Sequence, residues 1–329
     1  MRRWLCSAVA LGLLVIGLAV PARARSSTRW AYYDPRDARS LASLQAQHQH
    51  LDIVSPAYWK IQPNGNVTSS EQPKVVAQMR AWGLQVIPMV QKYSWFDKMH
   101  PWISNPIART RTADQLAALV EAGGYEGIHI DIENIHNDDG GYLTAFLDTL
   151  ADRLRPKGRL ITLALPARTE DQSGWHRAFD YVALGERADL VVIMAYDHGY
   201  AAGQPAPVAP LPWVRDVVAY TQARIPNAKI LLGIPFYGYD WNVSRRGWAR
   251  YVGVDEVVGK VGQRGYDPAS GAAWLRYADG SGQHMVFYEN WQSVQAKFDL
   301  AASADVRGWA AWRLGYEDPA VWTLLAPRR

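Results

Sequence analysis

Residues 190–194 read Leu-Val-Val-Ile-Met, an uninterrupted apolar run in which β-branched side chains predominate. Such a run is typical of a strand that is buried on both faces, as the strands of a parallel sheet are. Apolar, β-rich runs recur along the chain at intervals that leave room for a helix between most of them. The eight predicted strands are Trp30–Tyr33, Asp52–Trp59, Gln85–Val90, Gly127–Ile132, Leu160–Leu165, Leu190–Tyr196, Ile230–Phe236 and Gly308–Trp312.

Helical periodicity fills several of the intervals between these strands. In the segment Leu143–Leu154, for example, leucines and a phenylalanine recur every three or four residues, which places them on one helix face. The other predicted helices are Thr112–Glu121, Trp213–Ala223 and Trp291–Ala302. Alternation of strand and helix over 329 residues predicts an α/β protein, a closed (β/α)8 TIM barrel.

One interval, between the seventh and eighth strands, is too long for a single helix. It contains two β-rich segments, Ala272–Tyr277 and Gln283–Tyr288, on either side of a glycine-containing turn, and this pattern predicts a hairpin. We therefore expect a small α+β insertion at residues 238–290 that forms one wall of a groove. The catalytic barrel is expected to span residues 25–329, including this insertion.

The first 24 residues have the pattern of an export signal. Arg2 and Arg3 precede an apolar run, and Ala22-Arg23-Ala24 is typical of a cleavage site. We expect a secreted, extracytoplasmic protein of the cell envelope; an uncleaved signal that anchors the chain in the membrane remains an alternative. The single cysteine lies in this leader, which excludes thiol catalysis in the mature chain.

Composition narrows the class of partner. Without the three arginines of the leader, 32 basic residues face 31 acidic ones, and no basic cluster suggests a nucleic-acid surface. The chain has 15 Trp and 17 Tyr but only 6 Phe. Flat aromatic rings with a polar edge suit a groove that stacks sugar rings, although some of these residues are expected to fill the core.

The densest chemistry lies in the fourth predicted strand, which reads Tyr-Glu-Gly-Ile-His-Ile-Asp-Ile-Glu-Asn over residues 125–134. Alternation along a strand places His129, Asp131 and Glu133 on one face, and we expect that face to point toward the barrel axis. Glu133 comes last, near the carboxyl end where barrel enzymes hold their active sites. Two acids close together raise the pKa of one of them, as a general acid requires. A structural polar network is the alternative interpretation.

At these residues the chain resembles glycoside hydrolase family 18, which includes chitinases and spore peptidoglycan hydrolases. Gly127, Asp131 and Glu133 match the family's D-G-x-D-x-D-x-E pattern, whereas Glu126 and His129 depart from it. Further segments that resemble the family, and its spore-hydrolase branch in particular, are Met194–Asp197, Gly238–Trp241, Glu289–Ser293 and Trp312–Pro319.

The resemblance implies cleavage of β-1,4 bonds next to N-acetylglucosamine by substrate-assisted retaining catalysis, which is an exception to the usual scheme of two catalytic carboxyl groups. It implies that Glu133 is the acid and base, that Asp131 assists it, and that Tyr196 aligns the acetamido group. Groove contacts are expected from Tyr32, His129, Asn134, Met194, Asp197, Tyr239, Trp241 and Trp312. We expect a monomer without metal or cofactor whose partner is an N-acetylglucosamine-containing polysaccharide.

Two other functions remain open at this level. The chain could be a sugar-binding barrel of the same family with weak or no catalysis, because a barrel can keep its groove and lose its chemistry. It could also be a barrel that binds and inhibits another hydrolase, which would require a large exposed apolar patch. The sequence leaves open whether the substrate is peptidoglycan, chitin or an N-glycan, and whether cleavage is exo or endo.

Overall fold

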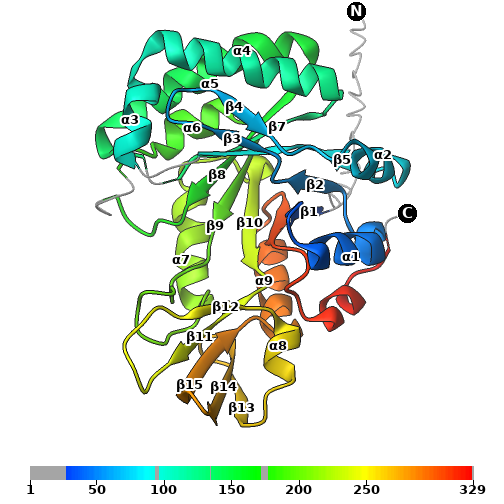
Figure 1. Ribbon diagram of the computed structural model, residues 1–329, viewed down its shortest axis with the longest axis vertical. Helices are drawn as coiled ribbons and strands as arrows, with labels where there is room; N and C mark the ends of the chain where they lie inside the picture. The colour runs from blue at the N-terminus through cyan, green and yellow to red at the C-terminus, as the bar shows by residue number, and fades with distance from the viewer. Residues whose placement is uncertain (1–26, 93–95, 134, 172–176, 328–329) are drawn as a thin grey trace, which may run out of the picture.

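The computed structural model describes residues 27–92, 96–133, 135–171 and 177–327. Its main sheet carries eight parallel strand positions in chain order (Figure 1). They are β1 (Thr28–Tyr33), β2 (Ile53–Pro56) with its continuation β3 (Trp59–Ile61), β5 (Gln85–Val86) with its continuation β6 (Met89–Lys92), β7 (Gly127–Asp131), β8 (Leu160–Pro166), β9 (Leu190–Met194), β10 (Ile230–Pro235) and β16 (Gly308–Trp312). All eight predicted strands are present.

The sheet closes on itself through the second and third strand positions. Strand β1 pairs with β16 on one side and with β2 on the other, and β2 pairs with β5. At the break between β5 and β6, the Ile87 N–H donates to the Val54 carbonyl oxygen (3.0 Å), and the His129 N–H donates to the Pro88 carbonyl oxygen (2.9 Å). The break therefore interrupts the strand without opening the ring, and the fold is a (β/α)8 barrel.

Helices connect the strands and cover the outside of the barrel. They are α1 (Ala38–Gln47), α2 (Pro73–Ala81), α3 (Phe96–Ser104), α4 (Pro106–Gly123), α5 (Gly140–Leu154), α6 (Tyr181–Arg187), α7 (Leu211–Gln222) and α9 (Trp291–Ser303). The four predicted helices correspond to α4, α5, α7 and α9. A short antiparallel strand, β4 (Val67–Ser69), pairs with β3, and a 3-10 helix over Pro319–Leu324 follows β16.

Two apolar layers hold the barrel together. The outward-facing Ile128 and Ile130 of β7 belong to the large cluster that also contains Phe146 and Leu150 of α5. A smaller cluster fills the interior of the barrel. It consists of Trp30, Tyr32, Ile53, Ile87, Met89, Val192, Leu231 and Ala310. The predicted alternation of the two faces of β7 is therefore correct, and its polar face points to the barrel axis.

A second sheet lies between β10 and β16 in the chain and projects from one end of the barrel (Figure 1). It is antiparallel, in the order β12-β11-β15-β14-β13, with strands β11 (Gly238–Asn242), β12 (Arg250–Val252), β13 (Gln263–Asp267), β14 (Ala272–Asp279) and β15 (Gly282–Tyr288). A short helix, α8 (Val254–Val258), packs on it. The predicted hairpin is β14–β15; strands β11, β12 and β13 were not predicted as strands.

The expected export signal, residues 1–24, lies outside the described residues. Within the described part of the chain, no helix combines the length and the apolar character that a membrane-spanning segment needs.

Candidate active site

The inner face of β7 leads directly into a cavity of about 120 Å³ at the carboxyl ends of the barrel strands. Parallel strands that close into a barrel bring their carboxyl ends to one rim, so side chains distant in sequence meet there. Of the predicted site residues, seven line this cavity. They are Tyr32, Asp131, Glu133, Met194, Tyr196, Asp197 and Trp312, and Ala164 completes the lining.

Asp131 is the most buried acid of the cavity, with 5% of its surface exposed. Its Oδ2 accepts a hydrogen bond from the Gln91 side-chain amide (2.8 Å). Its Oδ1 is buried and finds no hydrogen-bond partner among the described residues. A buried carboxylate oxygen without a donor is unfavourable, so this atom is an acceptor that a donor group of a ligand could satisfy.

Glu133 lies beyond Asp131, nearer the opening of the cavity. Burial, together with the neighbouring carboxylates of Asp131 and Asp197, raises the pKa of the Glu133 carboxyl to about 8, while Lys92 opposes the shift. Burial also raises the pKa of Asp131, although the Gln91 amide and the Glu133 side chain counteract this rise. The outer acid is therefore protonated at neutral pH and can donate a proton.

His129, predicted as a groove contact, is fully buried beneath the cavity and does not line it. Its Nε2 hydrogen bonds with the Tyr32 hydroxyl (2.9 Å) and its Nδ1 with the Thr162 hydroxyl (2.8 Å). Burial lowers the pKa of His129 to about 3, so the imidazole is neutral. The neutral ring adds no charge next to Asp131. Its hydrogen bond to the Tyr32 hydroxyl holds Tyr32 in place.

Asp197 follows β9 with a left-handed backbone (φ 60°), a conformation that aspartate adopts more readily than most residues. Its Oδ1 accepts hydrogen bonds from the Tyr237 hydroxyl and from the Tyr239 hydroxyl (3.1 Å). Tyr239 does not itself line the cavity, but it holds Asp197, which does. A left-handed backbone at a residue other than glycine is often found at functional sites, and Asp197 lines the cavity.

The remaining predicted residues have different positions. Trp241 is buried, and its indole N–H donates to the Gly203 carbonyl oxygen (3.0 Å) away from the acids. Asn134 lies outside the described residues. The ring of Tyr196 lies close to Gly233, where a Cβ atom would approach the Tyr196 Cε1 at 3.1 Å and the Ile193 carbonyl oxygen at 2.4 Å. Glycine at this point of β10 leaves room for the tyrosine.

Sequence reasoning missed Gln91, which comes from β6 and lies opposite Asp131 in the register of β6 and β7. Strand alternation could have identified Gln91, because it is two residues beyond Met89 and therefore on the same face, and Met89 faces the barrel interior. A polar residue at an inward position next to an acid strand is a candidate partner of that acid.

Gln91→Leu is expected to lower kcat by about ten-fold, the value of one charge-assisted hydrogen bond, with little change in KM. Leucine keeps the volume of the side chain but removes the amide that donates to Asp131. Loss of this donor raises the pKa of Asp131, so the acidic limb of the pH profile should shift to higher pH. Kinetics over a range of pH measure both effects. Gln85→Leu, an exposed change on the same strand position, is the control; an unchanged kcat and pH profile for Gln91→Leu would show that the amide does not support Asp131.

Comparison with known proteins agrees with this geometry. The model of the glycosyl hydrolases family 18 matches residues 27–317. The chain belongs to this family and is a glycosidase.

Individual relatives fall into two groups. A cortical fragment-lytic enzyme of Bacillus subtilis is 28% identical over 324 residues, which cover 93% of this chain and 75% of that enzyme. The spore cortex-lytic enzyme SleL of Bacillus megaterium has a similar structure, with a TM-score of 0.83 and 26% identity over 92% of this chain and 74% of that chain. A chitinase from Chromobacterium violaceum has a TM-score of 0.84 and 26% identity, covering 91% of this chain and 97% of that chain.

Proposed function

We propose that the protein hydrolyses β-1,4 bonds next to N-acetylglucosamine by substrate-assisted retaining catalysis. The observation that carries this proposal is the cavity in which Asp131, Glu133 and Tyr196 come together, with a protonated outer acid and an unsatisfied inner carboxylate oxygen. A sugar acetamido group offers both an N–H donor and a carbonyl oxygen, and these are complementary to an acid and a tyrosine side by side.

In the proposed first step, the carbonyl oxygen of the 2-acetamido group attacks the anomeric carbon while the bond to the leaving oxygen breaks. Glu133 gives its proton to that leaving oxygen. The sugar becomes a cyclic oxazolinium ion, and Glu133 is then the base that removes a proton from the attacking water. Holding the internal nucleophile next to the anomeric carbon contributes several kcal/mol to the rate enhancement.

Asp131 and Tyr196 act on the acetamido group. The unpaired Oδ1 of Asp131 accepts the acetamido N–H and stabilises the positive charge that develops on the ring. The Tyr196 hydroxyl keeps its proton, because burial and the nearby acidic groups raise the pKa of Tyr196 well above its usual value, and so it can donate to the acetamido carbonyl oxygen. Trp312, which packs edge-on against Tyr32 at 5.0 Å between ring centroids, offers a flat surface for the sugar.

The substrate that we propose is the glycan strand of peptidoglycan. Both the cortical fragment-lytic enzyme and SleL resemble the chain over more than nine-tenths of its length. SleL is described as a spore cortex-lytic enzyme. The chitinase relative makes a chitin oligomer the natural comparison substrate. We further propose that residues 1–24 direct export, which would bring the enzyme to such a substrate, and that the enzyme acts as a monomer.

Mass spectrometry of the products from purified peptidoglycan and from chitin oligomers tests the proposal. We expect new reducing ends on N-acetylglucosamine and retained β configuration in the first product. Oligomers without the N-acetyl groups should be cleaved at least about a thousand-fold more slowly, because the internal nucleophile is missing.

Cleavage of the deacetylated oligomer at a similar rate would contradict substrate assistance. Tight binding of acetylated oligomers without any cleavage would instead identify a sugar-binding barrel of the same family.

A further inference from the structure

The insertion sheet carries a second cavity of about 610 Å³, five times the volume of the one that holds the acids. This volume is in the range of small-molecule and ligand sites. The cavity lies on the face of β11 that bears Asp240 and Asn242, whereas Tyr239 and Trp241 point to the opposite face of that strand. The proposed glycosidase reaction uses none of its residues.

The floor of this cavity is a closed network around Asp240, which is 6% exposed. Its Oδ1 pairs with His284 Nδ1 (2.7 Å) and its Oδ2 accepts from the Tyr277 hydroxyl (2.7 Å). Arg250 lies 3.5 Å from Oδ2 and also pairs with Glu256. Hydrogen bonds from Tyr277 and His284, together with the nearby Arg250 guanidinium, stabilise the buried carboxylate.

Ser281, His284 and Asp240 form a chain that resembles a hydrolytic triad, with the Ser281 hydroxyl 2.9 Å from His284 Nε2. However, the Ser281 hydroxyl donates to Asp279 (2.7 Å), and the Ser281 N–H donates to the same carboxylate (2.8 Å). The hydroxyl hydrogen is therefore directed away from His284. This chain stabilises the β14–β15 turn and does not activate a nucleophile.

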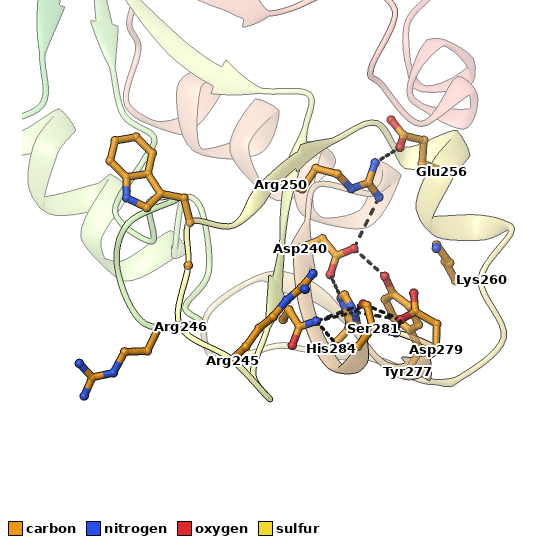
Figure 2. A pocket seen from close by; sticks show the side chains of 13 residues that line it. Asp240, Arg245, Arg246, Arg250, Glu256, Lys260, Tyr277, Asp279, Ser281 and His284 are labelled. Carbon is orange, nitrogen blue, oxygen red and sulfur yellow. Dashed lines mark hydrogen bonds and ion pairs between the residues drawn. The ribbon is translucent and has the colours of Figure 1, made fainter.

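The cavity is lined by more cations than acids, with Arg245, Arg246, Arg250 and Lys260 against Asp240, Glu256 and Asp279. Figure 2 shows Arg245 and Lys260 on opposite sides of the Asp240–His284 pair, while Arg246 points away from it. Among the described residues, neither Arg245 nor Lys260 has an acidic partner within ion-pair distance; the Lys260 ammonium lies over the Tyr277 ring at 4.8 Å. The charge of Lys260 also acts on Asp279 of the same cavity. Since neither Arg245 nor Lys260 is held in an ion pair among the described residues, both are available to an anionic ligand.

A loop at the rim of this cavity contacts the loop that follows β9, the strand that leads to Asp197. The loop from Val243 to Ala249 is bonded to the loop after β9 through the Ala249 N–H and the Ala201 carbonyl oxygen (2.7 Å). Trp248 in this loop is 80% exposed and lines both the cationic cavity and a neighbouring one of about 820 Å³ that reaches Trp241. Tyr239, which bonds Asp197 in the acid cavity, is three residues from Asn242, a span of about 10 Å along a strand.

We infer that this cavity binds the carboxylates of the peptides carried by a peptidoglycan strand whose glycan lies in the catalytic groove. Arg245 and Lys260 pair with the carboxylates, and Trp248 offers an apolar face to the adjoining sugar or peptide. The inference rests on the proposed action on peptidoglycan and extends it. It predicts tighter binding of peptide-bearing strands than of chitin, which carries no carboxylates.

The test measures binding, so that it does not depend on hydrolysis. The full chain with Glu133→Gln is titrated with peptide-bearing glycan chains, with the same chains after an amidase has removed the peptides, and with chitohexaose. Adding Arg245→Ala and Lys260→Ala is expected to weaken binding of the peptide-bearing chains by roughly ten-fold, the sum of two partly exposed ion pairs. Raising the salt concentration should reduce the difference.

Lys74→Ala, which removes an exposed lysine from α2 on the barrel, is the matched control. Binding of chitohexaose should change by less than about two-fold in the double variant, which would also show that the groove is intact. The inference is overturned if peptide-bearing and stripped chains bind equally well, or if the double variant weakens chitohexaose as much as the peptide-bearing chains. A failure of the glycosidase proposal appears separately, as a lack of cleavage by the unmodified chain.

Discussion

Glu133→Gln is expected to lower hydrolysis of a chitin oligomer or of peptidoglycan by at least about a thousand-fold, because the leaving oxygen loses the general acid that protonates it. Glutamine has the same shape and no proton of suitable acidity. The variant should fold and be at least as stable above neutral pH. Since the native state raises the pKa of Glu133 to about 8, ionisation of this group destabilises the fold as pH rises from its unfolded value toward 8, and glutamine removes that effect.

Two measurements separate a general acid from a structural residue. A substrate with a highly acidic leaving group needs little protonation, so the variant should lose much less activity on it. In the unmodified enzyme, kcat/KM should fall above about pH 8, where the Glu133 carboxyl ionises. Glu186→Gln, an exposed change, is the control. Near-normal turnover of an unactivated substrate by Glu133→Gln would remove this residue from the mechanism.

Asp131→Asn is expected to lower kcat by about 10²–10³-fold while the affinity for an oligosaccharide changes far less. Asparagine keeps the size of the side chain and can still accept the Gln91 amide. It loses the negative charge that stabilises the oxazolinium ion, and this charge matters more in the transition state than in the bound substrate.

Single-turnover kinetics and equilibrium binding to the same oligosaccharide measure these two effects separately. Asp138→Asn, in the short 3-10 helix Asn137–Asp139, is the matched control because its side chain is 79% exposed. A reduction that appears entirely in binding would show that Asp131 holds the substrate without assisting the chemistry. An unchanged rate constant would exclude it from both roles.

The sequence alone determined the barrel and the direction of its acids. In the strand Gly127–Asp131, isoleucines alternate with polar residues. Since successive side chains point to opposite faces of a strand, the isoleucines pack against the helices and the acids point toward the barrel axis. The position of Glu133 at the end of this strand placed it near the rim. Both inferences depend only on local geometry, which a short stretch of sequence specifies.

His129 shows where local reasoning ends. Its strand position predicted the inward face correctly, but its place along the axis depends on neighbouring strands. Tyr32 from β1 and Thr162 from β8 enclose its ring, so it lies beneath the cavity instead of lining it. Depth within a barrel follows from the stagger of strands that are far apart in sequence.

The partners of the acids were decided only by tertiary structure. Gln91 meets Asp131 because β6 and β7 pair in one register, and the pKa of Glu133 rises because burial and Asp197 act on it across the barrel. The cationic cavity arises likewise from Arg245 and Lys260, which the antiparallel pairing of the insertion sheet and the packing of α8 bring to one rim. The periodicity of a sequence indicates which face of an element a residue occupies. The distances between elements, by contrast, are set only in the folded barrel, and the electrostatic energies depend on those distances.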